Sequence, residues 1–111
     1  MEIKLINCTP HKINIIKPSG TNETLEPSGI LPRLKETTDG APNMIVSGVP
    51  VTNQYLQGVE NLPEPKPETY LIVSKLVAQA AGTRSDLLVP ATVRDSTGKI
   101  IGCNGFYRTK L

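Results

Sequence analysis

Proline and glycine divide this chain into short pieces, and this constrains the fold more than any other feature of the sequence. The 111 residues include 10 prolines and 9 glycines, which end regular elements or set the turns between them. Apolar runs recur between these breaks, so the chain has apolar surface to bury. One Phe, three Tyr and no Trp leave Ile, Val and Leu to build the core, and these residues suit strands. We therefore expect a compact β-rich α+β fold, with residues 1–111 as a single domain of six to eight short strands and one short helix.

The first half of the chain is expected to contain strands alone. Apolar runs at residues 3–6 and 13–16, joined by a polar connection, predict a hairpin that ends before Pro18, because proline cannot donate to a ladder. Residues 30–36 predict a further strand, in which Pro32 marks a sheet edge.

The middle of the chain is less regular. Short apolar pieces at residues 44–46 and 49–51 flank Ser47-Gly48. Residues 62–67 alternate proline with charge, which predicts a stiff extended connector. The alternative for this segment is a site for a proline-reading domain.

The second half predicts the helix and a hairpin. An apolar run at 70–73 is followed by Ser74, a good N-cap, and by Gly82, a good residue for the end of a helix. Residues at helical spacing form one apolar stripe: Val73, Leu76, Val77, Ala80 and Ala81. A second apolar run at 87–90 then leads into strands that turn through residues 96–98.

Positive charge is concentrated in the second half. Residues 1–60 carry five Lys/Arg and six Asp/Glu, a net of −1, and residues 61–111 carry seven and four, a net of +3, which together give the +2 of the chain. This excess is too small for the dense basic stripe that a duplex-DNA-binding domain usually carries. It suits a small anionic ligand or a modestly acidic partner surface.

Three of the four arginines stand beside turns or strand ends in this basic half: Arg84, Arg94 and Arg108. Surface ion pairs, such as Arg84 with Asp86, are the ordinary explanation and contribute little to stability. The functional interpretation is a guanidinium cluster for phosphate, with Tyr107 stacking on a base or ribose. Ser74 and Lys75 could add backbone N–H donors and charge at the helix start, the alternative being an ordinary capped helix.

The segment Asn7-Cys8-Thr9-Pro10-His11 is the second candidate site. Asn7 and Thr9 can hydrogen-bond to nearby backbone, and His11 is the single histidine. A histidine here can act as a general base or bind a ligand, or it can simply stabilise the bend. Catalysis also requires a nucleophile or orienting acid that the sequence does not identify.

Known catalytic and metal-binding patterns are missing from the sequence. Residues 96–99, Ser-Thr-Gly-Lys, lack both the earlier glycine and the following Ser/Thr of a phosphate-binding loop. One histidine and two distant cysteines have no recognised metal-ligand spacing. The sequence therefore favours a protein that is not an enzyme and that holds no metal and no cofactor.

Cys8 and Cys103 are expected to be free thiols. The N-terminus lacks the basic and long apolar regions of a secretion signal, and a reducing cytosol keeps cysteines unpaired. No apolar stretch approaches the roughly 18 residues of a membrane span. We expect a cytoplasmic protein of a bacterial host cell that does not contact a membrane.

Both ends of the chain resemble a group of small uncharacterised proteins of bacteria and their phages. The resemblance rests on Ile-Asn-Cys-Thr-Pro-His at residues 6–11 and on the segments 70–74, 84–86, 93–95 and 98–103, and it does not extend to the middle. It implies a bacterial cytoplasm and a phage origin, and it carries over no functional residue. By analogy, one class of small phage proteins binds and sequesters nucleotide-derived immune signals.

The leading hypothesis is a non-catalytic protein that binds a small anionic, nucleotide-like ligand, such as a phage-encoded sponge for a nucleotide immune signal. The candidate ligand-binding residues are Asn7, Thr9, His11, Ser74, Lys75, Arg84, Asp86, Arg94, Tyr107 and Arg108. The alternatives are a protein–protein inhibitor or adaptor that uses residues 62–67 and a strand edge, and a small hydrolase with His11 as base. We also expect a homo-oligomer, because edge-type strands with few inward charges leave surface for a symmetric partner.

Overall fold

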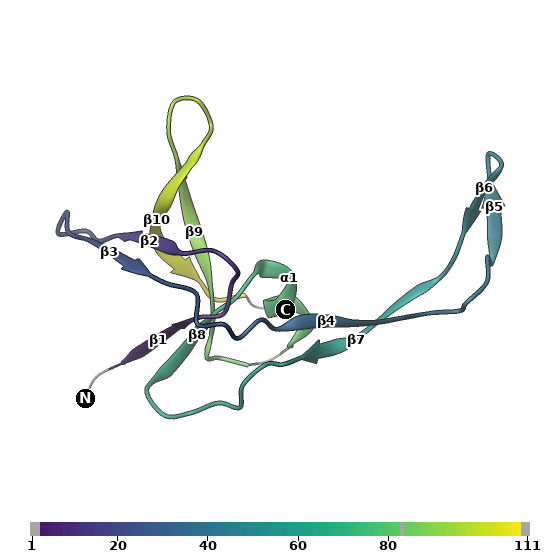
Figure 1. The fold of residues 1–111 in the computed structure, drawn as a ribbon, viewed down its shortest axis with the longest axis horizontal. Helices are drawn as coiled ribbons and strands as arrows, with labels where there is room; N and C mark the ends of the chain where they lie inside the picture. Colours follow the sequence, from purple (N-terminus) through teal and green to yellow (C-terminus); the bar gives the residue numbers. More distant parts are fainter. Residues whose placement is uncertain (1–2, 83, 110–111) are drawn as a thin grey trace.

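The computed structural model of this chain describes residues 3–82 and 84–109, and these form ten strands and one short helix (Figure 1). The prediction of a small β-rich fold with one short helix is confirmed, and the strands exceed the predicted six to eight because β3 and β7 were not anticipated. The elements are β1 (Lys4–Asn7), β2 (Ile13–Ile16), β3 (Asn22–Leu25), β4 (Arg33–Thr38), β5 (Met44–Val46), β6 (Val49–Val51), β7 (Gln54–Glu60), β8 (Thr69–Ile72), α1 (Lys75–Ala80), β9 (Leu87–Arg94) and β10 (Ile100–Tyr107).

Six strands form the main sheet, in the order β1-β8-β9-β10-β2-β3. The pairs β1–β8, β8–β9 and β10–β2 are parallel, and β9–β10 and β2–β3 are antiparallel. The predicted hairpin of residues 3–6 with 13–16 is therefore wrong, because β1 and β2 are separated in the sheet by three other strands. Apolar alternation identifies a strand but not its neighbour, and here each of the two strands finds a partner from the C-terminal half.

Strand β8, the second strand of the main sheet, is buried on both faces. Leu71 and the following Val73 pack on one side with Val77 of α1, whereas Ile72 packs on the other side with Ile13 and Ile15 of β2. Successive side chains of a strand point to opposite faces, so this one apolar run supplies both layers of the core. Its continuous apolar character agrees with the parallel neighbours on each side.

Helix α1 begins and ends as its sequence predicts. The Ser74 side chain accepts a hydrogen bond from the Val77 backbone N–H at 3.3 Å, and Gly82 has a positive φ of 80°. Val77 and Ala78 are its buried residues, while Leu76, placed in the expected apolar stripe, is 63% exposed. With 6 residues the helix covers only a small part of one side of the sheet, and no other element among the described residues packs over Leu76.

Residues 33–60 form a long hairpin that we call the arm. Strand β4 pairs with β7 near the sheet, and β5 pairs with β6 at the tip. The tip turn places Ser47 and Gly48 at φ values of 49° and 79°, the two positive angles of a type I′ hairpin turn. Figure 1 shows the arm projecting from the rest of the molecule. The radius of gyration is accordingly 17.6 Å, against about 13 Å for a compact domain of this size.

The Asn7 side chain joins the two ends of the main sheet. Its Nδ2 donates to the carbonyl oxygens of His11, at 2.8 Å, and of Leu25 in β3, at 3.1 Å. Its Oδ1 accepts from the backbone N–H of Thr9, at 3.0 Å, and from the Thr9 hydroxyl, at 2.6 Å. The residue is 2% exposed, so four hydrogen bonds compensate for the burial of one amide group.

Replacing Asn7 with alanine is expected to lower the free energy of unfolding by about 2–4 kcal/mol, because two carbonyls, one N–H and one hydroxyl each lose a hydrogen bond. Urea unfolding followed by circular dichroism measures the change. Asn104→Ala, at an exposed position of β10, is the matched control and should move the midpoint little. Equal midpoints for the two variants would contradict the structural importance of the Asn7 amide.

Cys8 and Cys103 are free and buried, in the clusters on the two opposite sides of the sheet. Burial raises the pKa of both thiols; a hydrogen bond from Ser28 partly opposes the shift at Cys8, and the Gly105 backbone does so at Cys103. A raised pKa in the folded state favours the protonated thiol. Its contribution to stability is therefore complete below the unfolded-state pKa of 9.0 and is lost as the pH rises through the folded-state pKa.

We expect both thiols to resist a thiol-specific reagent in the native protein and both to react in urea without prior reduction. The free energy of unfolding should be unaffected by these groups near neutral pH and should fall above about pH 9. Absorbance titration with the thiol reagent counts the groups. Fewer than two reactive thiols in the unfolded, unreduced chain would contradict the free state of these cysteines.

Candidate functional site

A cleft of about 420 Å³ lies where the β1–β2 connection, the residues before α1 and the strands β9 and β10 meet. We call it the His11 cleft. Its volume falls in the range of small-molecule sites. The apolar lining residues are Ile13, Val73, Pro90, Ile100, Ile101 and Cys103, together with Gly102; the polar ones are Thr9, His11, Lys12, Asn14, Ser74 and Thr92. An apolar surface with polar groups around it suits a ligand that has both an apolar and a polar part.

Lys12 is the one formally charged residue among those that line the His11 cleft, and none of the described lining residues carries a carboxylate. His11 and Lys12 are both exposed, so their side chains are accessible. The local charge is therefore positive. An anionic group would meet no like charge from the lining, and Lys12 would attract it.

The position of Arg94 extends this positive charge along β9. Pro90 and Thr92 both line the His11 cleft, and Arg94 is the next residue on the same strand face because side chains alternate. It lies opposite the cleft residue Ile100 in the β9–β10 ladder. The exposed Arg94 guanidinium donates to the Gly98 carbonyl at 2.7 Å, which holds the base of the turn and leaves other guanidinium N–H groups for a ligand.

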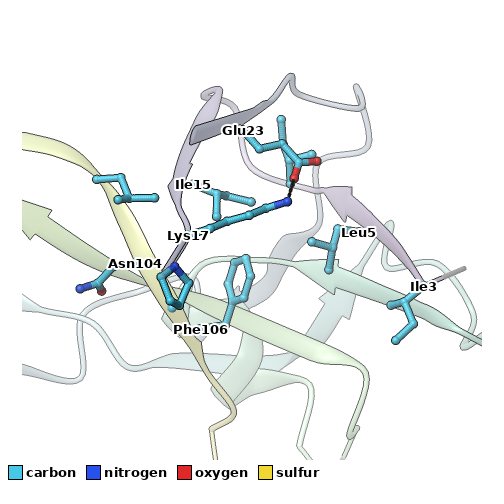
Figure 2. Close-up of a pocket in the computed structure, with 11 residues that line it drawn as sticks. Ile3, Leu5, Ile15, Lys17, Glu23, Asn104 and Phe106 are labelled. Atoms are coloured by element: carbon cyan, nitrogen blue, oxygen red, sulfur yellow. Dashed lines mark ion pairs between the residues drawn. The ribbon is translucent and has the colours of Figure 1, made fainter. Parts of the chain in front are cut away.

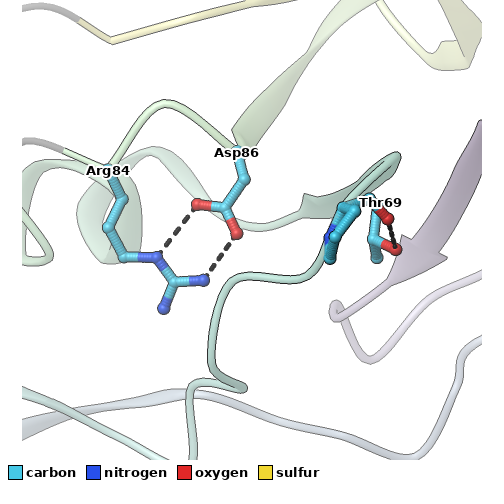
Figure 3. Close-up of polar contacts among 4 residues, drawn as sticks. Thr69, Arg84 and Asp86 are labelled. Carbon is cyan, nitrogen blue, oxygen red and sulfur yellow. Dashed lines mark hydrogen bonds and ion pairs between the residues drawn. The ribbon is translucent and has the colours of Figure 1, made fainter.

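Arg94 lies beside the cleft and is not among its lining residues, and the predicted site at Arg84 lies elsewhere. Arg84 binds Asp86 through two hydrogen bonds of 2.9 and 2.6 Å (Figure 3). The bond to Asp86 is the main cause of a raised pKa for Arg84. Figure 3 also shows Thr69, whose hydroxyl donates to the Pro67 carbonyl at 3.1 Å and fixes the end of the proline-rich connector. The Arg84 guanidinium and the Asp86 carboxylate thus bind each other, and their pairing stabilises the segment before β9.

The remaining predicted residues divide into three groups. Thr9, His11 and Ser74 come together in the His11 cleft, although the Ser74 oxygen also caps α1. Lys75, Tyr107 and Arg108 are exposed and do not line it, and the Asn7 amide is engaged in the hydrogen bonds described above. Tyr107 is 64% exposed, so a stacking role would require a ligand outside the cleft.

Sequence reasoning missed two cations near this site. Lys12 follows His11 directly, and its proximity to the single histidine was the available signal. Arg33 lines a smaller cavity of about 230 Å³ that shares Thr9 and Ser74 with the His11 cleft. Arg33 comes from the start of the arm, so only the tertiary fold brings it to this place.

A second depression, which we call the edge groove, has a volume of about 530 Å³ (Figure 2). Both edge strands of the main sheet contribute to it, with Leu5 from β1 and Leu25 from β3. Its Lys17 is paired with Glu23 at 2.7 Å (Figure 2). This pairing neutralises the local charge, so the edge groove has less to attract an anion than the His11 cleft.

Comparison with known proteins gives no assignment for this chain: no family model, no curated protein and no solved structure matches it. Within residues 3–82 and 84–109, no group of three or more His, Cys, Asp and Glu side chains could hold a metal ion. The same described residues contain no helix that is long and apolar enough to cross a membrane. The choice of the His11 cleft as the candidate site therefore rests on its geometry.

Gly102 explains how β10 approaches β2 at the His11 cleft. A Cβ atom at this position would lie 2.7 Å from the Asn14 carbonyl oxygen and 3.2 Å from Cδ1 of Ile16. The first distance is shorter than real Cβ contacts, and its partner is backbone, so the strands would have to separate. Asn14 also donates from Nδ2 to the Ile101 carbonyl at 3.3 Å, which ties the same two strands.

Gly102→Ala is expected to lower the free energy of unfolding by about 1–3 kcal/mol through this overlap. Gly105→Ala is the matched control in the same strand, because a Cβ there meets nothing within 4 Å. Urea unfolding of the two variants against the parent measures the difference. A Gly102 variant as stable as the Gly105 variant would show that β2 and β10 are not packed this closely.

Proposed function

We propose that this protein binds a small anionic, nucleotide-like ligand in the His11 cleft without converting it. One observation supports the proposal above the others. The cleft combines an apolar surface with a cationic residue, Lys12, and no carboxylate among the residues that line it. A nucleotide has the complementary parts, a flat base with little charge and an ionised phosphate.

Different residues in and beside the cleft suit different parts of a nucleotide. Ile13, Val73 and Ile101 offer apolar surface to a base, which gains free energy as water leaves both partners. Lys12 and Arg94 would attract the phosphate, and Arg94 can offer two N–H groups to its oxygens. His11 can donate to or accept from the ligand through its ring nitrogens.

The proposal describes binding and not catalysis because no nucleophile is paired with His11 among the described residues. The Thr9 hydroxyl donates to Asn7 Oδ1, and the Ser74 oxygen accepts the helix-capping bond. A nucleophile must give its proton to a base within hydrogen-bond reach. Among the described residues, no hydrogen bond joins the His11 ring to such a group.

A protein that binds without turnover lowers the free concentration of its ligand in proportion to its own abundance. The resemblance to small phage and bacterial proteins implies a bacterial cytoplasm and a phage origin. By analogy with the small phage proteins that sequester immune signals, we propose a nucleotide-derived signal as the ligand. This is the sponge hypothesis, for which we propose the His11 cleft as the binding site. The hydrolase alternative differs from the sponge hypothesis in one observable result: a hydrolase would cleave the ligand, whereas a sponge would leave it unchanged.

The test is a thermal-shift panel of mono-, di- and cyclic nucleotides, followed by calorimetric titration of the ligand with the largest shift. Binding only to the folded state should stabilise it by about 2.7 kcal/mol at a hundredfold excess over the dissociation constant. Lys12→Ala should weaken binding by about 10- to 100-fold, the range of one lost hydrogen bond to a charged group. Arg94→Ala should weaken binding in the same direction.

Two controls match these variants. Lys66→Ala removes a lysine of the proline-rich connector, and Arg108→Ala removes an exposed arginine that does not line the His11 cleft. Both should bind like the parent. Decanoate, an anion with an apolar chain and no ring, should give a smaller shift if the base is recognised.

Three results would contradict the proposal. The absence of any shift across the nucleotide panel would exclude a nucleotide-like ligand. Undiminished binding by Lys12→Ala and His11→Ala would move the site away from the His11 cleft. A chemically altered ligand, recovered after denaturation of the protein, would establish the hydrolase alternative.

A further inference from the structure

We propose that residues 40–59, the tip of the arm together with most of β7 and called the arm tip below, form the surface through which one copy of this chain binds a second copy. This inference is independent of the His11 cleft. It rests on the charge, exposure and area of the arm.

The arm tip has no formal charge. Residues 40–59 contain no Asp, Glu, Lys or Arg, although 20% of the whole chain is charged. Across the ribbon, Glu36 pairs with Leu56 and Asp39 accepts a hydrogen bond from the Tyr55 hydroxyl, and carboxylates do not attract nucleic acid, an acidic peptide or an anionic membrane. The arm tip can pack against another uncharged surface. The arm tip of a second copy is such a surface, and it is present at the same concentration as the first.

Apolar side chains of the arm are exposed on both faces of its ribbon. Neighbouring residues of a strand point to opposite faces, and here neighbours in β5 and β6 are exposed alike. The large exposed apolar residues are Met44, Ile45, Val46, Val49, Tyr55 and Leu56. Ile45 is 71% exposed and Leu56 is 59% exposed, so an apolar patch of this extent marks an interaction site.

The arm tip also lacks the support that a hairpin of this kind needs. Strands β5 and β6 form a two-stranded sheet of their own, and the contacts of the arm with α1 come from β4 and β7. An isolated two-stranded hairpin is marginally stable in water. Its free edges are also open to pairing with another strand. Packing against a second chain would stabilise the hairpin and cover its free strand edges.

The surface area of the chain agrees with this inference. The accessible surface is 7856 Å², whereas a compact monomer of 12.0 kDa is expected to expose about 6000 Å². The excess is about 1900 Å² per chain by subtraction, and homodimers that fold only as dimers bury roughly 1000–2500 Å² per partner. The excess, summed over the whole chain, is of the size that an obligate dimer would cover.

The test compares exposed apolar residues on and off the arm. Light scattering of the parent should give a multiple of the 12.0 kDa chain mass. The double variant Ile45→Asp with Leu56→Asp should associate at least tenfold more weakly. Leu76→Asp, at a residue of α1 that is 63% exposed, is the matched control and should keep the parent mass.

Amide hydrogen exchange of the parent protein keeps the proposal testable if the double variant does not fold. The amides of β5 and β6 should be protected at high protein concentration. Unprotected amides there would overturn the proposal. So would a parent that is monomeric throughout the micromolar range, or a double variant that keeps the parent mass. A monomer that instead floats with phosphatidylcholine vesicles, and loses this property in Ile45→Asp, would show that lipid and not a second copy covers the arm.

Discussion

The hydrogen bonds of the Asn7 amide determine much of the geometry of this molecule. Strand β1 has β8 on one side, and on the other side Asn7 contacts the connection to β2 and the end of β3. Its backbone carbonyl also accepts from the Ser28 N–H and hydroxyl, at 2.9 and 2.7 Å. One residue thus holds both edges of the six-stranded sheet. Thr9, the first lining residue of the His11 cleft, is two residues further along the chain and is bonded to Asn7, so the rim of the cleft depends on the same bonds.

Local structure was largely predictable from the sequence, and strand pairing was not. Ser74 and Gly82 mark the helix because caps depend on neighbouring residues alone, and Ser47-Gly48 marks a turn for the same reason. The partner of β1, by contrast, is more than sixty residues away. Strand β3 escaped prediction because it is mostly polar and exposed. Strand β7 escaped because its apolar residues Tyr55 and Leu56 are adjacent and do not alternate with polar ones.

The candidate site shows the same division. Thr9, His11 and Ser74 were predicted and do lie together, since two turn-forming segments reach the same part of the sheet. Lys12 and Arg33 were not anticipated, because their relevance comes from which elements the fold places side by side. Arg84 and Asp86 satisfy each other instead, as a closely spaced arginine and aspartate often do. The type of a residue therefore predicted the chemistry of its side chain better than its position in the fold.

The strand order has a consequence for how the protein is made. Strands β1 and β2 emerge first during synthesis, yet their partners β8 and β10 emerge last. The main sheet can therefore form only after nearly the whole chain has left the ribosome, and sheets dominated by such distant pairings fold slowly. During this interval the neutral, apolar stretch 40–59 is exposed to other nascent chains. The type I′ turn at Ser47-Gly48 can close the arm early, because it needs only local residues.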